Sequence, residues 1–239
     1  MTSKDDVAGF RKPHPGTQPD YLQAAYGGTW KRAPQQAPIA IPATLSEITA
    51  PSFAQHQLGA HAADLTAGHR GEPIGERIIV GGRVLDENAR PVQHVLLEIW
   101  QANAAGRYVH AADQHDAPLD PNFIGIGQVV TDAEGRYRFK TIKPGAYPWR
   151  NHHNAWRPAH IHLSLLGPAL GTRLVTQLYF PGDPLLGVDP IFNSVADAQA
   201  RERLVSTLDW ERCESEYALG YRFDIVLRGR KQTPWELRS

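Results

Sequence analysis

Two histidines with one residue between them, His160 and His162, begin an apolar run that continues to residue 166. The alternation of this run predicts a β-strand, in which residues two apart point to the same face. The two imidazoles would then lie side by side, and neutral imidazole is the commonest metal ligand in proteins. The pair therefore predicts two ligands of a metal site, although the spacing also allows a hydrogen-bonded surface pair.

The search for further ligands narrows the class of metal site. A cupin site needs another histidine downstream, and no histidine follows His162. A facial triad of two histidines and one carboxylate is disfavoured, because residues 163–172 contain no carboxylate. A zinc site with three histidines, completed by His152 or His153, stays open.

Two tyrosines near this segment offer oxygen ligands. Tyr147 lies between prolines in a turn, and Tyr108 follows the predicted end of an earlier strand. A free phenol has a pKa near about 10, but a trivalent cation stabilises the coordinated phenolate at neutral pH. Two phenolates with two imidazoles would favour Fe(III) over softer or less charged ions. Spacing alone equally allows both tyrosines to be ordinary packing aromatics.

The composition excludes several classes of protein. The 239 residues carry 25 basic and 25 acidic side chains, so the charge gives no indication of a nucleic-acid or acidic-membrane partner. Cys213 is the one cysteine, which excludes a disulfide framework and a thiolate zinc or iron–sulfur site. No apolar run approaches the roughly 20 residues that span a bilayer, and the N-terminus lacks a signal-peptide pattern. We therefore expect a cytoplasmic protein.

The chain divides into two predicted parts. Residues 1–70 are rich in proline and glycine, which predicts an extended arm with short helical turns. This arm carries Tyr21, Tyr26 and Trp30, and large aromatic side chains are costly to expose. The arm is therefore expected to wrap over the core or over a partner subunit. Residues 71–239 have the texture of a β domain.

This second part predicts an all-β fold, a mixed β-sandwich with large loops and one or two short helices. Short runs of β-branched and aromatic residues alternate with turn residues, as is typical of sandwich strands. The pair Gly81 and Gly82 predicts a bulge or bend, and residues 132–135 have the composition of a hairpin turn. An apolar stripe predicts one helix at 195–208. The strands are expected at residues 77–85, 95–101, 127–131, 136–140, 160–166, 174–180 and 221–227.

The two tyrosines, the His-x-His pair and the segments around them resemble the intradiol ring-cleavage dioxygenases. The matching segments are residues 73–80, 98–108, 119–123, 141–150, 156–162, 176–184 and 218–228. The second part of the chain matches closely and the arm more loosely. The resemblance implies a non-haem iron enzyme on a β-sandwich.

The resemblance also implies a role for each matching residue. One catalytic Fe(III) per chain would be bound by Tyr108, Tyr147, His160 and His162. Tyr147 would be displaced from iron when substrate binds. Arg157 would stabilise negative charge on the substrate ring, and Gln177 would lie beside the ring carbon that reacts with dioxygen. The residues expected to contact substrate are Trp100, Trp149, Tyr179, Ile191 and, in the arm, Tyr21.

The implied reaction is oxygen-dependent ring cleavage of a catechol. Family members that act on catechol or hydroxyquinol begin with a helical dimerisation domain, whereas the proline-rich arm favours the protocatechuate-cleaving type. That type yields 3-carboxy-cis,cis-muconate in the β-ketoadipate pathway of bacterial aromatic degradation. It pairs the iron-binding subunit with a homologous α subunit in an (αβ)n oligomer. The arm departs from the family pattern by insertions after Tyr21.

Two alternatives remain at this point. A transthyretin-like sandwich would be a binding module without iron. An intradiol dioxygenase could instead act on a chlorinated or hydroxylated catechol.

Overall fold

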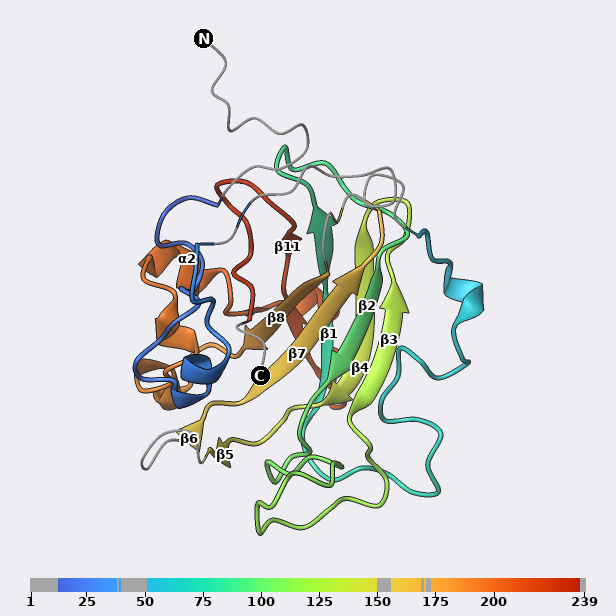
Figure 1. Cartoon of the computed structure of the whole chain (residues 1–239). Coiled ribbons are helices and arrows are strands. Elements are labelled where there is room, and N and C mark those ends of the chain that lie inside the picture. The colour runs from blue at the N-terminus through green and yellow to red at the C-terminus, as the bar shows by residue number, and fades with distance from the viewer. Residues whose placement is uncertain are drawn as a thin grey trace.

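Two β-sheets lie face to face at the centre of the molecule (Figure 1). The computed structural model describes residues 13–37, 39, 51–149, 156–168, 170 and 173–236. The first sheet is antiparallel throughout and has the order β3-β2-β7-β8. Its strands are β3 (Ile126–Val130), β2 (Leu96–Trp100), β7 (His160–Leu166) and β8 (Leu174–Tyr179).

The second sheet is built around β1 (Arg77–Leu85) and is mixed. β1 pairs antiparallel with β4 (Arg136–Ile142) and parallel with β10 (Leu219–Arg222) and β11 (Ile225–Val226). β9 (Thr207–Leu208) continues the sheet beyond β10. A separate two-stranded sheet joins β5 (Tyr147–Pro148) to β6 (Trp156–Arg157). The predicted mixed β-sandwich is thereby confirmed.

The core lies between the two large sheets, and β7 has one face in it. Ile161, Leu163 and Leu165 are fully buried and pack in the core with residues of β2 such as Leu97. Each such side chain contributes on the order of 1.5–3 kcal/mol by leaving water. Because side chains alternate along a strand, the histidines of β7 point to the opposite face, outside the sandwich core. The core thus holds the strand in place without occupying the face that carries the imidazoles.

The glycine pair in β1 does not form the predicted bulge. The pairing of β1 with β4 runs without interruption from Arg77 opposite Ile142 to Arg83 opposite Arg136. A Cβ atom on Gly82 would lie 1.9 Å from the carbonyl oxygen of Phe223. Glycine is needed at Gly82 because another backbone segment approaches it closely, so the bulge prediction was wrong.

The turn at residues 132–135 forms, but it does not close a hairpin. The Gly135 amide donates to the carbonyl oxygen of Asp132 at 2.9 Å, and Gly135 has a positive φ of 68°. The strands on either side, β3 and β4, belong to different sheets. The turn therefore carries the chain from one layer of the sandwich to the other.

The predicted helix at 195–208 is much shorter in the structure. Helix α2 spans Ala198–Glu202 and is capped by the side chain of Asp197, which accepts from the Ala200 amide. Beyond it, the carbonyl oxygen of Leu204 accepts from the amide of Tyr179, and the amide of Ser206 donates to the carbonyl oxygen of Tyr179, both at 2.8 Å. The backbone after α2 pairs with the end of β8 instead of continuing the helix.

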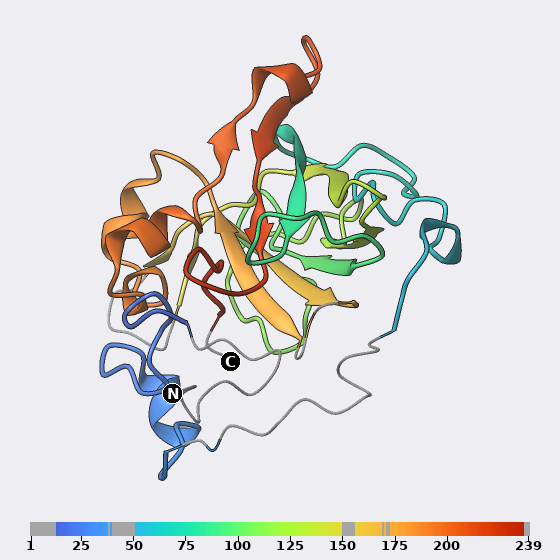
Figure 2. The same ribbon diagram turned by 90° about the horizontal axis from the view of Figure 1, so that it is seen from above.

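Short 3-10 turns make up the remaining helical structure. They are η1 (Gly27–Lys31), η2 (Gln55–Gln57), η3 (Pro184–Gly187), η4 (Phe192–Ser194) and η5 (Trp210–Arg212). The segment around η5 projects from the sandwich at the top of Figure 2. None of the helices in the described ranges is long and apolar enough to cross a membrane.

The arm contacts the rest of the chain at both of its described stretches. Residues 13–37 lie beside the segment that carries η3, η4 and α2 in both views (Figures 1 and 2). Farther along, the amide of Leu65 donates to the carbonyl oxygen of Lys140 at 2.9 Å, and the Leu65 side chain is part of the core.

Candidate metal centre and substrate pocket

The two histidines of β7 lie together, as their spacing predicts. The ring centroids of His160 and His162 are 4.8 Å apart, with an interplanar angle of 72°. Nδ1 of His160 is 2.7 Å from the carbonyl oxygen of Pro158, and Nδ1 of His162 is 2.9 Å from a carboxylate oxygen of Glu236. Because both partners are acceptors, each Nδ1 carries the proton. Nε2 of each ring is therefore unprotonated and carries the lone pair that can bind a metal.

Both predicted tyrosine ligands meet these histidines. Oη of Tyr147 is 3.3 Å from Nε2 of His160, and β5 holds Tyr147 opposite Arg157. The ring of Tyr108 is 5.5 Å from that of Tyr147 and 6.3 Å from that of His162, between centroids. The Asp113 carboxylate accepts the backbone amide of Tyr108 at 2.8 Å and so fixes the loop that carries it. Residues from three separate segments thus converge on one point.

The electrostatics of this cluster fit a cation. Burial, with a smaller contribution from Tyr147, raises the pKa of Tyr108 well above its ordinary value, and burial also raises the pKa of Tyr147 although Arg157 opposes the rise. Burial and then the charge of Arg157 hold the pKa of His160 well below its usual range, so this imidazole is neutral. The protein by itself therefore keeps the phenols protonated, and a bound trivalent ion is what would reverse this.

The donor atoms present are suited to a hard metal ion. Oη of Tyr108 is buried without a hydrogen-bond partner, which is costly unless something else binds it. Among the described residues, no group of three His, Cys, Asp or Glu side chains could hold a metal ion, so the tyrosines are needed to complete a site. Two phenol oxygens and two imidazole nitrogens suit Fe(III). His152 and His153, the alternative zinc ligands, lie outside the described residues.

Arg157 is held beside the cluster by a buried ion pair. Its Nε donates to Oδ1 of Asp189 at 2.9 Å, and its Nη2 donates to Oε1 of Gln177 at 2.6 Å. The guanidinium also lies 5.6 Å from the ring centroid of Trp149. Asp189 is completely buried. The cation is fixed in position before any substrate arrives, which is the arrangement that electrostatic catalysis requires.

Gln177 and Tyr179 belong to the same polar network. Oη of Tyr179 donates to Oε1 of Gln177 at 2.5 Å and lies 3.1 Å from Oδ2 of Asp189. Nε2 of Gln177 is buried and faces the Glu236 carboxylate, whose pKa it helps to lower. The Tyr179 ring is 1% exposed and lies 5.8 Å from that of His160, between centroids. Gln177 and Tyr179 both bond to Arg157 and so help to hold its guanidinium beside the cluster.

Two tryptophans, Trp100 and Trp149, lie against residues of the site. The rings of Trp100 and His162 stack with an interplanar angle of 5° and a centroid distance of 4.8 Å. Trp149, beside the Arg157 guanidinium, packs with Ile191 and with Tyr26 of the arm. The rings of Tyr26 and Trp149 meet edge to face, with centroids 4.8 Å apart.

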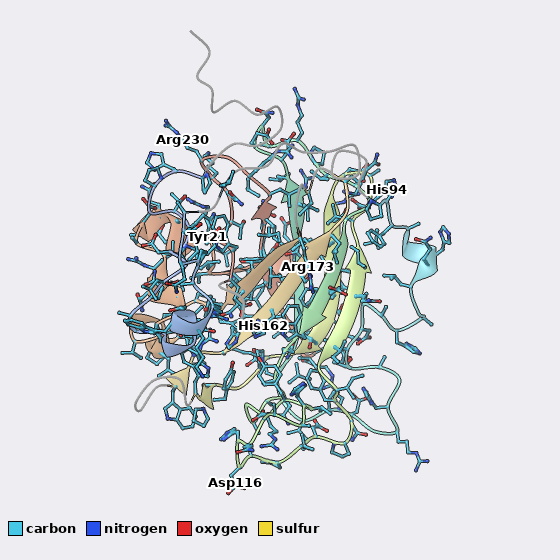
Figure 3. All side chains as sticks on the ribbon, in the orientation of Figure 1. Tyr21, His94, Asp116, His162, Arg173 and Arg230 are labelled. Carbon is cyan, nitrogen blue, oxygen red and sulfur yellow. The ribbon has the colours of Figure 1, made fainter. Side chains whose placement is uncertain are left out.

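The structure does not bring Tyr21 to the four candidate ligands. Its side chain is 53% exposed and lines a groove of about 460 Å³ on the arm, together with Leu22, Trp30 and residues 33–37. Figure 3 shows Tyr21 on the arm, apart from His162. The arm tyrosine that packs against Trp149 and Ile191 in this chain is Tyr26.

Sequence reasoning missed three residues of the site, Tyr26, Asp189 and Glu236. Burial opposes ionisation of Glu236, but His162 and Arg157 lower its pKa below the ordinary value, so it is a carboxylate. Glu236 lies 74 positions from His162, and no local pattern links the two residues. Asp189 follows the short turn η3 and could have been found only as an acidic residue in an otherwise apolar segment.

Two family models match this chain. One, described as "Dioxygenase", matches residues 48–229 and therefore most of the chain. The other, described as "Protocatechuate 3,4-dioxygenase beta subunit N terminal", matches residues 10–44.

Individual proteins extend this likeness. The protocatechuate 3,4-dioxygenase beta chain of Burkholderia cepacia is 58% identical over 222 residues, which are 92% of this chain and 94% of that protein. The protocatechuate 3,4-dioxygenase alpha chain of Pseudomonas putida is 32% identical over 161 residues, covering 66% of this chain and 75% of that protein. The crystal structure of 3-chlorocatechol 1,2-dioxygenase from Rhodococcus opacus 1CP aligns with a TM-score of 0.54 at 26% identity, over 80% of this chain and 69% of that chain.

Proposed function

The chain belongs to the intradiol ring-cleavage dioxygenases, and we propose that it is the iron-binding beta chain of an enzyme that cleaves protocatechuate with dioxygen. The reaction is intradiol ring opening to 3-carboxy-cis,cis-muconate, a step of bacterial aromatic degradation. Family membership removes the alternative of an iron-free, transthyretin-like binding module. The observation that carries the proposal is the gathering of Tyr108 and Tyr147 beside the two histidines of β7, with Oη of Tyr147 3.3 Å from Nε2 of His160 and Oη of Tyr108 buried and unpartnered.

The proposed ligands of one Fe(III) per chain are Tyr108, Tyr147, His160 and His162. Their support is the O₂N₂ donor set and the fixed Nδ1 tautomers of both histidines. Ferric iron bound there would act as a Lewis acid that draws electron density from a catecholate and opens its ring to attack by dioxygen.

Tyr147 is placed to hold a substrate proton. It lies at the edge of the cluster, on a two-residue strand, with its Oη 3.3 Å from His160. Because burial raises the pKa of this phenol, a free Tyr147 phenolate is a strong base in this pocket. It can therefore accept a proton from a catechol hydroxyl.

Arg157 and Gln177 act on the substrate ring itself. The guanidinium is held by Asp189 and can stabilise the negative charge that develops as a ring carbon becomes nucleophilic. The side-chain amide of Gln177, held by Arg157 and Tyr179 at its carbonyl oxygen, can orient the same part of the substrate. The rings of Trp100 and Trp149 would confine the aromatic substrate between them.

The relationship to a beta chain and to alpha chains implies an alpha–beta assembly. We infer that the homologous alpha chain covers part of the pocket mouth. Large apolar side chains that stay exposed in the isolated chain, such as Ile124 at 52% and Ile126 at 62%, are suited to such burial.

The test is the visible absorption spectrum of the chain, purified with its alpha chain, before and after anaerobic addition of protocatechuate. We expect a phenolate-to-Fe(III) charge-transfer band that moves to longer wavelength with substrate and is weakened or lost in Tyr108→Phe and Tyr147→Phe. Tyr217→Phe is the matched control, because Tyr217 is 44% exposed and lies among surface charges. A protein that stays colourless after reconstitution with iron would exclude the ferric site.

Substrate choice needs a separate measurement. We expect kcat/KM for protocatechuate to exceed the values for catechol, hydroxyquinol and chlorocatechol. A higher kcat/KM for one of the other three would assign the chain to a different member of the same family.

A further inference from the structure

We propose that Glu236 is a positioning residue that orients His162 and balances the charge of the metal centre, and that the side-chain amide of Gln18 in the arm holds Glu236 in place. The inference rests on the iron site of the proposed function. It assigns a role to the two ends of the described chain, neither of which supplies a metal ligand.

The contact between Glu236 and His162 is direct and buried. The Glu236 carboxylate accepts from Nδ1 of His162 at 2.9 Å, and the two side chains are only 8% and 10% exposed. A carboxylate on the far nitrogen fixes the tautomer and ring orientation of a ligating histidine and increases its basicity. His160 instead donates to the neutral carbonyl oxygen of Pro158. The two imidazoles are therefore unequal, and His162 is the stronger donor.

The charge balance of the site gives Glu236 a second role. Two phenolates leave a ferric ion with one positive charge in excess, while neutral imidazoles add none. The nearby cation Arg157 is already paired with Asp189. The Glu236 carboxylate is thus placed to offset the remaining charge in a pocket where screening by water is weak.

The tail that carries Glu236, residues 233–236, is hydrogen-bonded to the sandwich through its backbone groups. The Glu236 amide donates to the carbonyl oxygen of Val175 on β8 at 2.7 Å. One residue along β8, the hydroxyl of Thr176 donates to the carbonyl oxygen of Pro234, also at 2.7 Å. The amide of Thr233 donates to the carbonyl oxygen of Val226 at 2.9 Å. These bonds fix the position of the carboxylate relative to β7, the neighbour of β8.

The side-chain amide of Gln18, in the arm, binds the backbone of the segment that carries Glu236. Its Oε1 accepts from the Trp235 amide at 2.8 Å, and its Nε2 lies 3.5 Å from the carbonyl oxygen of Thr233. The side chain is only 7% exposed. The arm itself is anchored nearby, because the Asp197 amide donates to the carbonyl oxygen of Gly16 at 2.9 Å. One amide thus joins residues 217 positions apart, immediately beside the partner of a proposed iron ligand.

The test compares three variants of the iron-loaded complex with wild type: Glu236→Ala, Glu236→Gln and Gln18→Ala. The measurements are the rate of iron loss to a chelator, the energy of the charge-transfer band and the Fe(III)/Fe(II) potential. Glu236→Ala should weaken iron binding about 10- to 100-fold. Glu236→Gln keeps an oxygen acceptor for Nδ1, so it should restore much of the iron retention while its potential rises because the negative charge is gone.

Gln18→Ala tests the positioning of Glu236 separately from its charge. It should accelerate iron loss by a smaller factor and leave the potential unchanged, since the carboxylate remains. Glu214→Gln is the matched control, because Glu214 pairs with Arg138 on the surface, where both side chains are about half exposed. If Glu236→Ala does not fold, the shift in potential of Glu236→Gln still decides the question.

Two results would overturn the inference while leaving the iron site intact. One is wild-type iron retention in Glu236→Ala, and the other is an unchanged potential in Glu236→Gln. A rate of iron loss in Gln18→Ala equal to that of wild type would overturn the role of the arm. Failure of the wild-type complex to bind iron at all would instead contradict the proposed function.

Discussion

Nε of Arg157 lies 2.9 Å from Oδ1 of Asp189, and both side chains are almost completely removed from solvent, at 3% and 0% exposure. The pair holds the guanidinium that faces Trp149 and the Gln177 side chain. A buried pair of this kind adds little stability compared with an apolar pair, but removal of one partner leaves an uncompensated charge. The same buried pair therefore affects the stability of the chain and positions the guanidinium that the proposed reaction uses.

Asp189→Asn should destabilise the protein by about 3–5 kcal/mol, because the Arg157 cation would remain buried without its counter-charge. Urea unfolding of the variant and wild type measures the difference. Glu134→Gln is the control, since its pair with Arg136 is more than half exposed and should contribute little to stability. Equal losses of unfolding free energy in the two variants would show that the buried pair contributes no more to stability than the exposed pair.

Arg157→Lys should lower kcat about 100-fold while the charge-transfer band of bound iron remains. Lysine keeps the positive charge but cannot reproduce the planar fork that bonds Asp189 through Nε and Gln177 through Nη2. Steady-state kinetics and the spectrum of the same sample separate the two effects. A lysine variant with wild-type kcat would mean that charge alone, without its orientation, is sufficient.

Tyr26→Ala should raise KM for protocatechuate up to about tenfold, with a smaller change in kcat. Tyr26 is 2% exposed and supports Trp149 edge to face, and such aromatic pairs contribute about 0.5–1.5 kcal/mol. Tyr21→Ala is the informative comparison, because the family resemblance implies that Tyr21 contacts substrate although it is exposed in the isolated chain. A larger effect of Tyr21→Ala would support that contact and assign Tyr26 to packing.

Asp64 should contribute stability at neutral pH that is lost in acid. Burial opposes its ionisation, but hydrogen bonds from Lys140 and Thr66 outweigh burial and lower the pKa of Asp64 below its ordinary value. A carboxyl whose pKa is lower in the folded state stabilises the fold above its unfolded pKa, about 3.9, and loses this effect as the pH falls through the folded value.

Asp64→Asn tests this dependence by urea unfolding at several pH values. Wild type should exceed the variant by no more than about 1 kcal/mol at pH 7, because the Asp64 and Lys140 side chains are partly exposed, at 31% and 22%. The difference should vanish well below pH 4. A difference that stays constant across this range would assign the effect to packing.

Much of the fold followed from local patterns. β1 and β7 have the predicted bounds, because a run rich in β-branched residues in β1 and an alternating apolar run in β7, nine and seven residues long, are typical of strands. The helix at 195–208 was predicted too long, since periodicity does not reveal that Leu204 and Ser206 bond to the backbone of Tyr179. Gly82 was assigned to a bulge because the close approach comes from Phe223, which lies between β10 and β11, far away in the sequence.

By itself, the sequence determined which residues could act as donors: two imidazoles on one strand face and, through the family resemblance, two phenols. Only the tertiary structure decided what surrounds those donors. Asp189 is 32 positions from Arg157, and Glu236 is 74 positions from His162. The side-chain period of a strand acts over a few residues, whereas these partners meet only after two sheets, a tail and an arm have packed together. The charge balance and the orientation of the site are therefore products of the fold.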